Sequence, residues 1–156
     1  MQYMENIISK NQITSILQSK NLTSLFQPVI DLNRASVYGH EALIRGPVET
    51  ELHAPLTLFE ACHLVGLTPE MEFLSREIVL QHYANSNDKN KFFVNVSPHC
   101  LQLNDSPFTF NCEQLDYLGL TPSDIVIEIT EGSSIKDFGK LRDTVNRYRD
   151  MGLQLP

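Results

Sequence analysis

The chain has 156 residues, of which 42% are hydrophobic and 20% are charged, the composition of an ordinary globular protein of about one domain. The formal net charge is -7 and there is no basic run, so binding to a DNA or RNA duplex through many phosphate contacts is not expected. No stretch approaches the roughly 18 apolar residues of a membrane-spanning helix, so membrane insertion is not expected either.

The elements of the first half can be predicted in chain order. The N-terminus, MQYMENIISKNQ, lacks the basic start and apolar core of a signal peptide, which favours a cytoplasmic location. Residues 7–19 have Ile and Leu at a loose helical spacing, which predicts a short helix. Residues 24–32 and 36–45 are β-rich and joined by a short NRA segment, which predicts two adjacent strands with a tight turn. Two helices are predicted next, over residues 56–67 and 69–86.

The second half alternates strands and helices. The runs KFFVNVSP (91–98) and DIVIEITE (124–131) are continuously apolar apart from single polar residues, a pattern typical of strands buried on both faces. Residues 135–153 predict an amphipathic helix, and QLP at 154–156 is interpreted as the start of another strand. This alternation predicts an α/β fold with parallel strands. Because no glycine-rich nucleotide-binding motif is present, a barrel is favoured over an open sheet.

Three predicted strands contain an oxygen-bearing side chain where an apolar residue is expected, namely Glu41, Asn95 and Glu128. An unpaired buried carboxylate is costly, but three such donors can converge on a divalent cation at the carboxyl end of a barrel. Two carboxylates and an amide suit Mg²⁺ or Mn²⁺ better than zinc. The alternative is that each is satisfied locally, Asn95 by turn backbone groups and the glutamates by lysine or arginine.

Other polar residues give weaker signals. Arg45, four residues after Glu41, can bind a phosphate as a planar fork or can be an ordinary surface arginine. Gln27 is a candidate hydrogen-bonding residue at the same edge. The five histidines are scattered without metal-ligand spacing, so structural or surface roles are expected. The three cysteines are interpreted as reduced structural thiols; they are Cys62, Cys100 and Cys112.

The segments LFQPVIDLNRASVYGHEALIR, FFVNVSP and IVIEITE, in this order and at these separations, strongly resemble the first half of an EAL domain, the bacterial cyclic di-GMP phosphodiesterase module. The letters E-A-L correspond to Glu41, Ala42 and Leu43. The resemblance implies a partial TIM-type (β/α) barrel, truncated after about half of its strands. We therefore divide the chain into an N-terminal helical segment, 1–22, and the N-terminal portion of an EAL domain, 23–156.

EAL domains use Mg²⁺ or Mn²⁺ to hydrolyse one phosphodiester of cyclic di-GMP, which gives pGpG. The resemblance therefore implies cyclic di-GMP as the ligand and assigns roles to seven residues. The implied metal ligands are Glu41, Asn95 and Glu128, of which the two glutamates are also catalytic. The implied nucleotide contacts are Gln27, Leu43 and Arg45. Glu131 is similar to a supporting acid near the site.

The family's later motifs, an Asp-Asp-Phe-Gly strand and later lysine, glutamate and glutamine motifs, are absent from these 156 residues. The D-F-G at 137–139 follows the Glu128 strand too closely and opens a helix, so we interpret it as coincidence. Two functions are expected: a cyclic di-GMP phosphodiesterase whose present chain is inactive, or a non-catalytic truncated EAL module for nucleotide binding or protein interaction. An open half-barrel exposes edges and apolar side chains, which predicts a homodimer or other self-association through the open edge.

Overall fold

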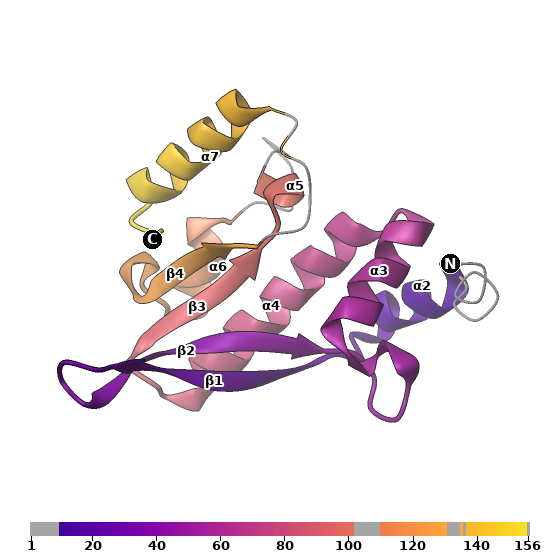
Figure 1. Cartoon of the computed structure of the whole chain (residues 1–156), viewed down its shortest axis with the longest axis horizontal. Coiled ribbons are helices and arrows are strands. Elements are labelled where there is room, and N and C mark those ends of the chain that lie inside the picture. The colour runs from indigo at the N-terminus through magenta and orange to yellow at the C-terminus, as the bar shows by residue number, and fades with distance from the viewer. Residues whose placement is uncertain (1–9, 102–109, 131–134, 136, 156) are drawn as a thin grey trace.

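The protein contains a four-stranded mixed sheet with strand order β1-β2-β3-β4, here seen in a computed structural model (Figure 1). The residues that the structure describes are 10–101, 110–130, 135 and 137–155. Strands β1 (Thr23–Asp31) and β2 (Ser36–Arg45) form an antiparallel hairpin. Strands β3 (Lys91–Val96) and β4 (Ile125–Ile129) extend the sheet in parallel with β2. The predicted hairpin and parallel strands are confirmed.

The helices predicted at 7–19, 56–67, 69–86 and 135–153 are present within a few residues of these bounds, whereas the short helices at 98–101 and 112–117 were not predicted. The helices are α2 (Lys10–Ser19), α3 (Pro55–Val65), α4 (Thr68–Ser86), α5 (Pro98–Leu101), α6 (Cys112–Tyr117) and α7 (Phe138–Asp150). Helix α7 begins after Asp137, whose Oδ1 accepts a hydrogen bond of 3.0 Å from the backbone N–H of Lys140. The D-F-G run is thus a helix N-terminus, as predicted. None of the helices in the described part of the chain is long and apolar enough to cross a bilayer, and the cytoplasmic location stays a prediction.

One face of the sheet packs against α4, which contacts β1, β2 and β3 (Figure 1). Successive residues of a strand point to opposite faces, and Ala42, Ile44, Phe92 and Val94 are buried on this face. Tyr83 of α4 stacks on Phe92 with ring centroids 4.2 Å apart. The main core therefore lies between the sheet and α4.

The other face of the sheet is partly open to solvent. Strand β3 was predicted to be buried on both faces, and this is wrong, because Phe93 is half-buried and Asn95 is exposed. An apolar run shows that one face is buried but carries no information about what covers the other. The start of β4 does follow the prediction, since Ile125, Val126 and Ile127 are all buried.

The sheet continues beyond β4. Gln154 forms a parallel bridge with Val126. The backbone N–H of Ile127 donates to the carbonyl of Gln154 at 2.7 Å, and the N–H of Gln154 donates to the carbonyl of Ile125 at 2.9 Å. These bonds agree with the prediction that a further strand begins at residue 154, while residue 156 lies outside the described residues.

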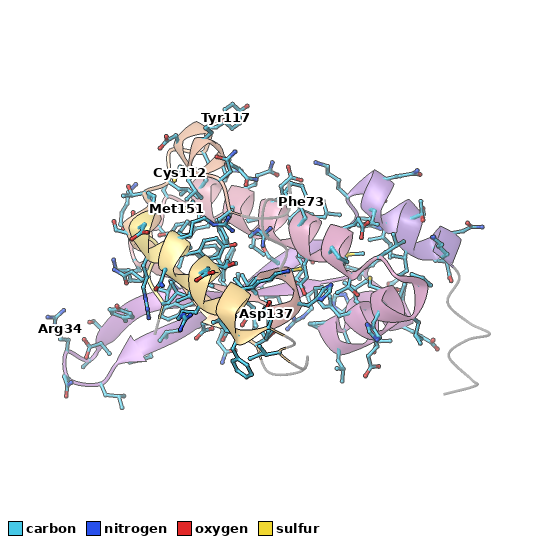
Figure 2. The ribbon with its side chains drawn as sticks, turned by 90° about the horizontal axis from the view of Figure 1, so that it is seen from above. Arg34, Phe73, Cys112, Tyr117, Asp137 and Met151 are labelled. Carbon is cyan, nitrogen blue, oxygen red and sulfur yellow. The ribbon has the colours of Figure 1, made fainter. Side chains whose placement is uncertain are left out.

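The turn of the β1–β2 hairpin projects beyond the helices (Figure 1), and Arg34 lies at this end (Figure 2). Its turn is stabilised by Asp31, whose Oδ1 accepts hydrogen bonds from the backbone N–H groups of Asn33 and Arg34 at 2.9 and 3.2 Å. A register shift between Val29 and Ile30 interrupts the ladder with β2. The hairpin base thus joins the core, whereas its tip is exposed.

Candidate functional site

The open face of the sheet brings Glu41 and Asn95 into direct contact. The Asn95 amide Nδ2 donates a hydrogen bond of 2.8 Å to Oε1 of Glu41. The two residues share a face because Glu41 is paired with Phe93 in the parallel ladder, and Asn95 is two positions further along β3. Two of the three predicted metal ligands therefore lie side by side.

Glu128 is the residue opposite Asn95 across the β3–β4 ladder. Its side chain is half-buried. Burial raises the pKa of the Glu128 carboxyl, and the negative charge of Glu41 raises that pKa further. Glu41 of β2 and Glu128 of β4 therefore lie on either side of Asn95 of β3.

The donor set suits a hard divalent cation. Two carboxylates that repel each other and one amide oxygen are brought to one place, and a cation there relieves the repulsion. Within the described residues no three His, Cys, Asp or Glu side chains cluster as a metal site, so the amide of Asn95 is needed as a third ligand. In the same part of the chain neither glutamate forms a salt bridge with lysine or arginine, as the local alternative requires.

The structure places the predicted nucleotide contacts on the same face of the sheet. Gln27 of β1 is paired with Glu41 and is exposed. Leu43 and Arg45 follow Glu41 at alternate positions of β2 and are half-buried. The Nη1 of Arg45 donates a hydrogen bond of 2.8 Å to the carbonyl of Ile44. Glu131 lies outside the described residues.

Two aromatic residues near this site were not singled out from the sequence. Phe93 precedes Asn95 on the same face, and its ring centroid is 6.0 Å from that of Tyr38. The ring of Phe93 lies over Gly39, where an added Cβ would be 2.8 Å from the ring and 2.4 Å from the carbonyl oxygen of Lys91. Glycine at position 39 thus makes room for Phe93. The sequence did contain a signal for Phe93: it lies two residues before Asn95 in the same predicted strand, and residues two apart in a strand share a face.

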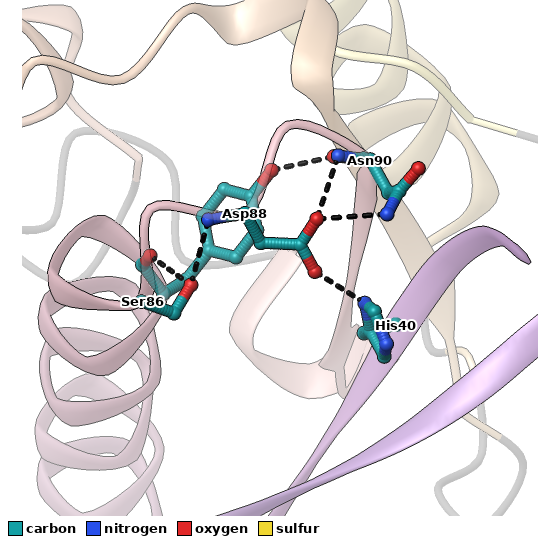
Figure 3. Close-up of polar contacts among 5 residues, drawn as sticks. His40, Ser86, Asp88 and Asn90 are labelled. Atoms are coloured by element: carbon teal, nitrogen blue, oxygen red, sulfur yellow. Dashed lines mark hydrogen bonds and ion pairs between the residues drawn. The ribbon is translucent and has the colours of Figure 1, made fainter.

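His40, which precedes Glu41, has a structural role (Figure 3). Its Nδ1 lies 2.6 Å from Oδ2 of Asp88, in the loop between α4 and β3. Oδ1 of Asp88 accepts hydrogen bonds from the backbone N–H and the side-chain amide of Asn90 at 2.9 and 2.8 Å. This cluster ties β2 to the start of β3, in agreement with the structural role expected for the histidines.

The buried cysteines are free thiols. Burial, and after it the charges of Glu70 and Glu72 respectively, raise the pKa values of Cys62 and Cys100 to about 12. Both thiols are therefore protonated at neutral pH and are poor nucleophiles. Their environment agrees with the predicted structural role.

The fold and the site together define an α/β domain that holds oxygen-bearing side chains near the carboxyl ends of parallel strands. The family model for the EAL domain matches residues 10–155, and the chain belongs to this family. The predicted EAL fold, a partial (β/α) barrel, is confirmed by this match and by the solved structures described next. No curated protein matches the chain.

Solved EAL structures resemble the chain. BlrP1 of Klebsiella pneumoniae, in a manganese and cyclic di-GMP complex, has a TM-score of 0.73 and 22% sequence identity. The EAL domain of Xanthomonas citri FimX in complex with cyclic di-GMP has a TM-score of 0.76 and 14% identity. An EAL domain protein of Listeria monocytogenes EGD-e has a TM-score of 0.71 and 21% identity.

These matches differ in how much of each protein they include. They cover 86%, 93% and 96% of the present chain, in the same order. The chain spans only 34%, 57% and 59% of the respective neighbours. At these identities the likeness shows the fold alone.

Proposed function

We propose that the open face of the sheet binds cyclic di-GMP together with Mg²⁺ or Mn²⁺, and that this site serves the hydrolysis of cyclic di-GMP to pGpG. One observation carries the proposal: Asn95 forms a hydrogen bond with Glu41 and is paired with Glu128 across the β3–β4 ladder. An amide and two mutually repelling carboxylates therefore share one face of the sheet. Membership of the EAL family supports it, as does the cyclic di-GMP in the BlrP1 and FimX structures.

Each residue has a proposed task. Glu41, Asn95 and Glu128 hold the cation, which when bound neutralises charge and lowers the pKa of a bound water. The guanidinium of Arg45 donates to phosphate oxygens as a planar fork. Gln27 offers an amide to the nucleotide, and Leu43 offers an apolar contact beside Glu41. The side chain of Asn95 orients Glu41 through the 2.8 Å hydrogen bond.

Binding of cyclic di-GMP and its hydrolysis need different parts of the site. Three protein oxygens leave about half of an octahedral coordination shell to water or phosphate. We therefore propose that these 156 residues by themselves bind cyclic di-GMP without hydrolysing it, and that hydrolysis is an activity of the complete family site. The alternative is a non-catalytic EAL module that binds nucleotide or another protein.

Calorimetric titration with cyclic di-GMP in the presence of Mn²⁺ tests the proposal, with pGpG followed by chromatography. Glu41→Ala should weaken binding by about tenfold or more, because it removes a ligand and the partner of Asn95. Glu60→Ala, which removes an exposed carboxylate from α3, should bind as the wild type does. Nucleotide binding that is equal in all three proteins would refute the site. Turnover by the wild type that disappears in Glu41→Ala would refute the separation of binding from hydrolysis.

We further propose that the chain self-associates as a two-fold dimer through the open side of the sheet. Leu25 of β1 is 54% exposed and is paired with the half-buried Leu43. Phe93 is also half-buried on this face. A second copy is a suitable cover, because a two-fold axis places the same apolar patch on both partners.

A further inference from the structure

The loop that follows Arg45 is closed at its base by residues 46 and 53. The backbone N–H of Gly46 donates to the carbonyl of His53 at 3.1 Å. The ring Nδ1 of His53 lies 3.0 Å from the carbonyl oxygen of Gly46, so Nδ1 carries the proton and donates. The backbone carbonyl of His53 therefore binds the Arg45–Gly46 peptide group, and the side chain of His53 binds the next one, Gly46–Pro47.

The backbone at position 46 is also fixed by a close approach. A Cβ added to Gly46 would lie 2.0 Å from the carbonyl oxygen of Leu52, a distance that no real Cβ contact allows. Leu52 itself is 6% exposed and belongs to the core. The end of β2 is thus held against the 3-10 helix η1 (Glu51–His53) by a backbone contact that only glycine permits.

The side of the loop that faces α2 has looser packing. A hollow of about 320 Å³ lies there, lined by residues of α2 and by Pro47, Thr50, Glu51 and Leu52 of the loop. Thr50 Oγ1 donates to the carbonyl of Pro47 at 2.8 Å, which is a bond internal to the loop. Gly46 does not line this hollow; it is buried, and both its N–H and its carbonyl contact His53.

We propose that His53 is a positioning residue for Arg45. The inference rests on the proposed role of Arg45 as a phosphate contact. The backbone bond from Gly46 to His53 fixes how closely the two residues approach, and the ring bond fixes the direction of the Gly46 carbonyl. The first bond holds the Arg45–Gly46 peptide group and so restricts the ψ angle of Arg45, and the second holds the Gly46–Pro47 peptide group, so His53 constrains the chain on the C-terminal side of Arg45.

Three variants of the 156-residue chain separate positioning from simple stability. His53→Ala removes the ring bond. His53→Asn restores a donor, because the Asn Nδ2 is the same number of bonds from Cα as the His Nδ1. His63→Ala removes an exposed imidazole from α3 and is the matched control. The measurements are the NMR order parameter of the Arg45 Nε–H in the free protein, cyclic di-GMP affinity with Mn²⁺, and thermal stability.

We expect His53→Ala to lower the Arg45 order parameter and to weaken cyclic di-GMP binding about fivefold, the equivalent of one neutral hydrogen bond. His53→Asn should restore the order parameter, and His63→Ala should leave it unchanged. An Arg45 order parameter unaffected by His53→Ala overturns the inference. So does a loss of thermal stability and Arg45 order that His53→Asn fails to rescue. If Arg45 becomes mobile in His53→Ala but the wild type binds no cyclic di-GMP, positioning is upheld and the proposed function fails.

Discussion

Asn95 and Glu41 are 54 positions apart in the chain, yet the amide of Asn95 donates a 2.8 Å hydrogen bond to the carboxylate of Glu41. The bond joins β2 to β3 on the face of the sheet opposite α4. It also leaves the amide oxygen of Asn95 available as an acceptor. Asn95 therefore links the two glutamates while adding no charge between them.

The substitution Asn95→Asp tests how a negative charge at position 95 affects stability and metal binding. Without metal, the third carboxylate repels Glu41 and loses the hydrogen bond, so the Tm should fall by about 2–4 °C, the equivalent of about 1 kcal/mol in a domain of this size. With Mn²⁺ the sign should reverse, because an additional anionic ligand binds the cation more tightly. Thermal melts with and without Mn²⁺ measure both effects.

Asn111→Asp is the matched control for this experiment. Asn111 is the N-cap of α6, and its side-chain oxygen accepts from the backbone N–H of Glu113 at 2.9 Å. Aspartate preserves that bond and adds the same charge at a favourable helix terminus. Its Tm should not fall or respond to Mn²⁺. A similar Mn²⁺ response in both variants would show that the metal effect does not come from the site.

Glu128→Gln should stabilise the metal-free protein. Burial and the charge of Glu41 both disfavour the ionised form of Glu128, so removing the charge at neutral pH relieves a cost. The Tm should rise by less than the roughly 2–4 °C that 1 kcal/mol represents here. Stabilisation by Mn²⁺ should be lost in the same variant. Glu60→Gln, on the exposed side of α3, should show neither change, and a lower Tm for Glu128→Gln would contradict the coupling of the two glutamates.

The elements of this fold could be predicted because they depend on local patterns. The helical spacing of residues 69–86 and the apolar run at 91–98 correspond to α4 and β3 to within two residues. The exposure of Asn95 could not be predicted in the same way. It depends on which elements cover the second face of the sheet, and the residues of β3 do not encode that.

For the site too, the features within one strand could be predicted from the sequence, but the contacts between separate segments could not. Alternation within one strand places Glu41, Leu43 and Arg45 on one face, and this follows from the sequence. The contact between Glu41 and Asn95 depends on the register of β2 against β3, which pairs Glu41 with Phe93. The bond from His53 to Gly46 depends on how a loop closes. Neither depends on a pattern within a single segment, so His53 was not distinguished from the other histidines.

Asp88→Asn should destabilise the protein in a pH-dependent manner. Partial burial favours the protonated form of Asp88, but hydrogen bonds from Asn90, the charge of His40 and the backbone of Lys89 outweigh it and lower the pKa of Asp88 below its ordinary value of 3.8. A lowered pKa means that the ionised form stabilises the fold above pH 3.8, and that this contribution is lost as the pH falls through the folded-state value.

The variant should therefore be less stable by about 1–2 kcal/mol at pH 7, the contribution of a charged hydrogen-bond network. The difference from the wild type should shrink as the pH falls below 3.8. Urea unfolding at pH 7 and at a pH below 3.8 measures this difference in stability. Asp116→Asn, an exposed change on α6, should differ little from the wild type at either pH. An Asp88→Asn penalty that is the same at both pH values would show that shape, not charge, causes the effect.

The association of two chains can be tested at Leu25. Pro28 lacks an N–H and the ladder is irregular after Val29, so the outer edge of β1 is a poor template for a further strand. Association should therefore use the face of the sheet, where Leu25 is 54% exposed. We expect light scattering after size exclusion to give twice the chain mass of 17.7 kDa at micromolar concentration. Leu25→Lys should convert the protein to a monomer, because it places a charge in the apolar contact.

Leu56→Lys is the matched control, because Leu56 is 72% exposed but belongs to α3 and not to a strand of the sheet. It should remain a dimer. Since the proposed interface covers the face that holds Glu41 and Asn95, cyclic di-GMP with Mn²⁺ should compete with association and shift the wild type toward the monomer. A wild-type monomer across the micromolar range would exclude this dimer. A dimer that persists in Leu25→Lys but is lost in Leu56→Lys would place the interface on α3 instead.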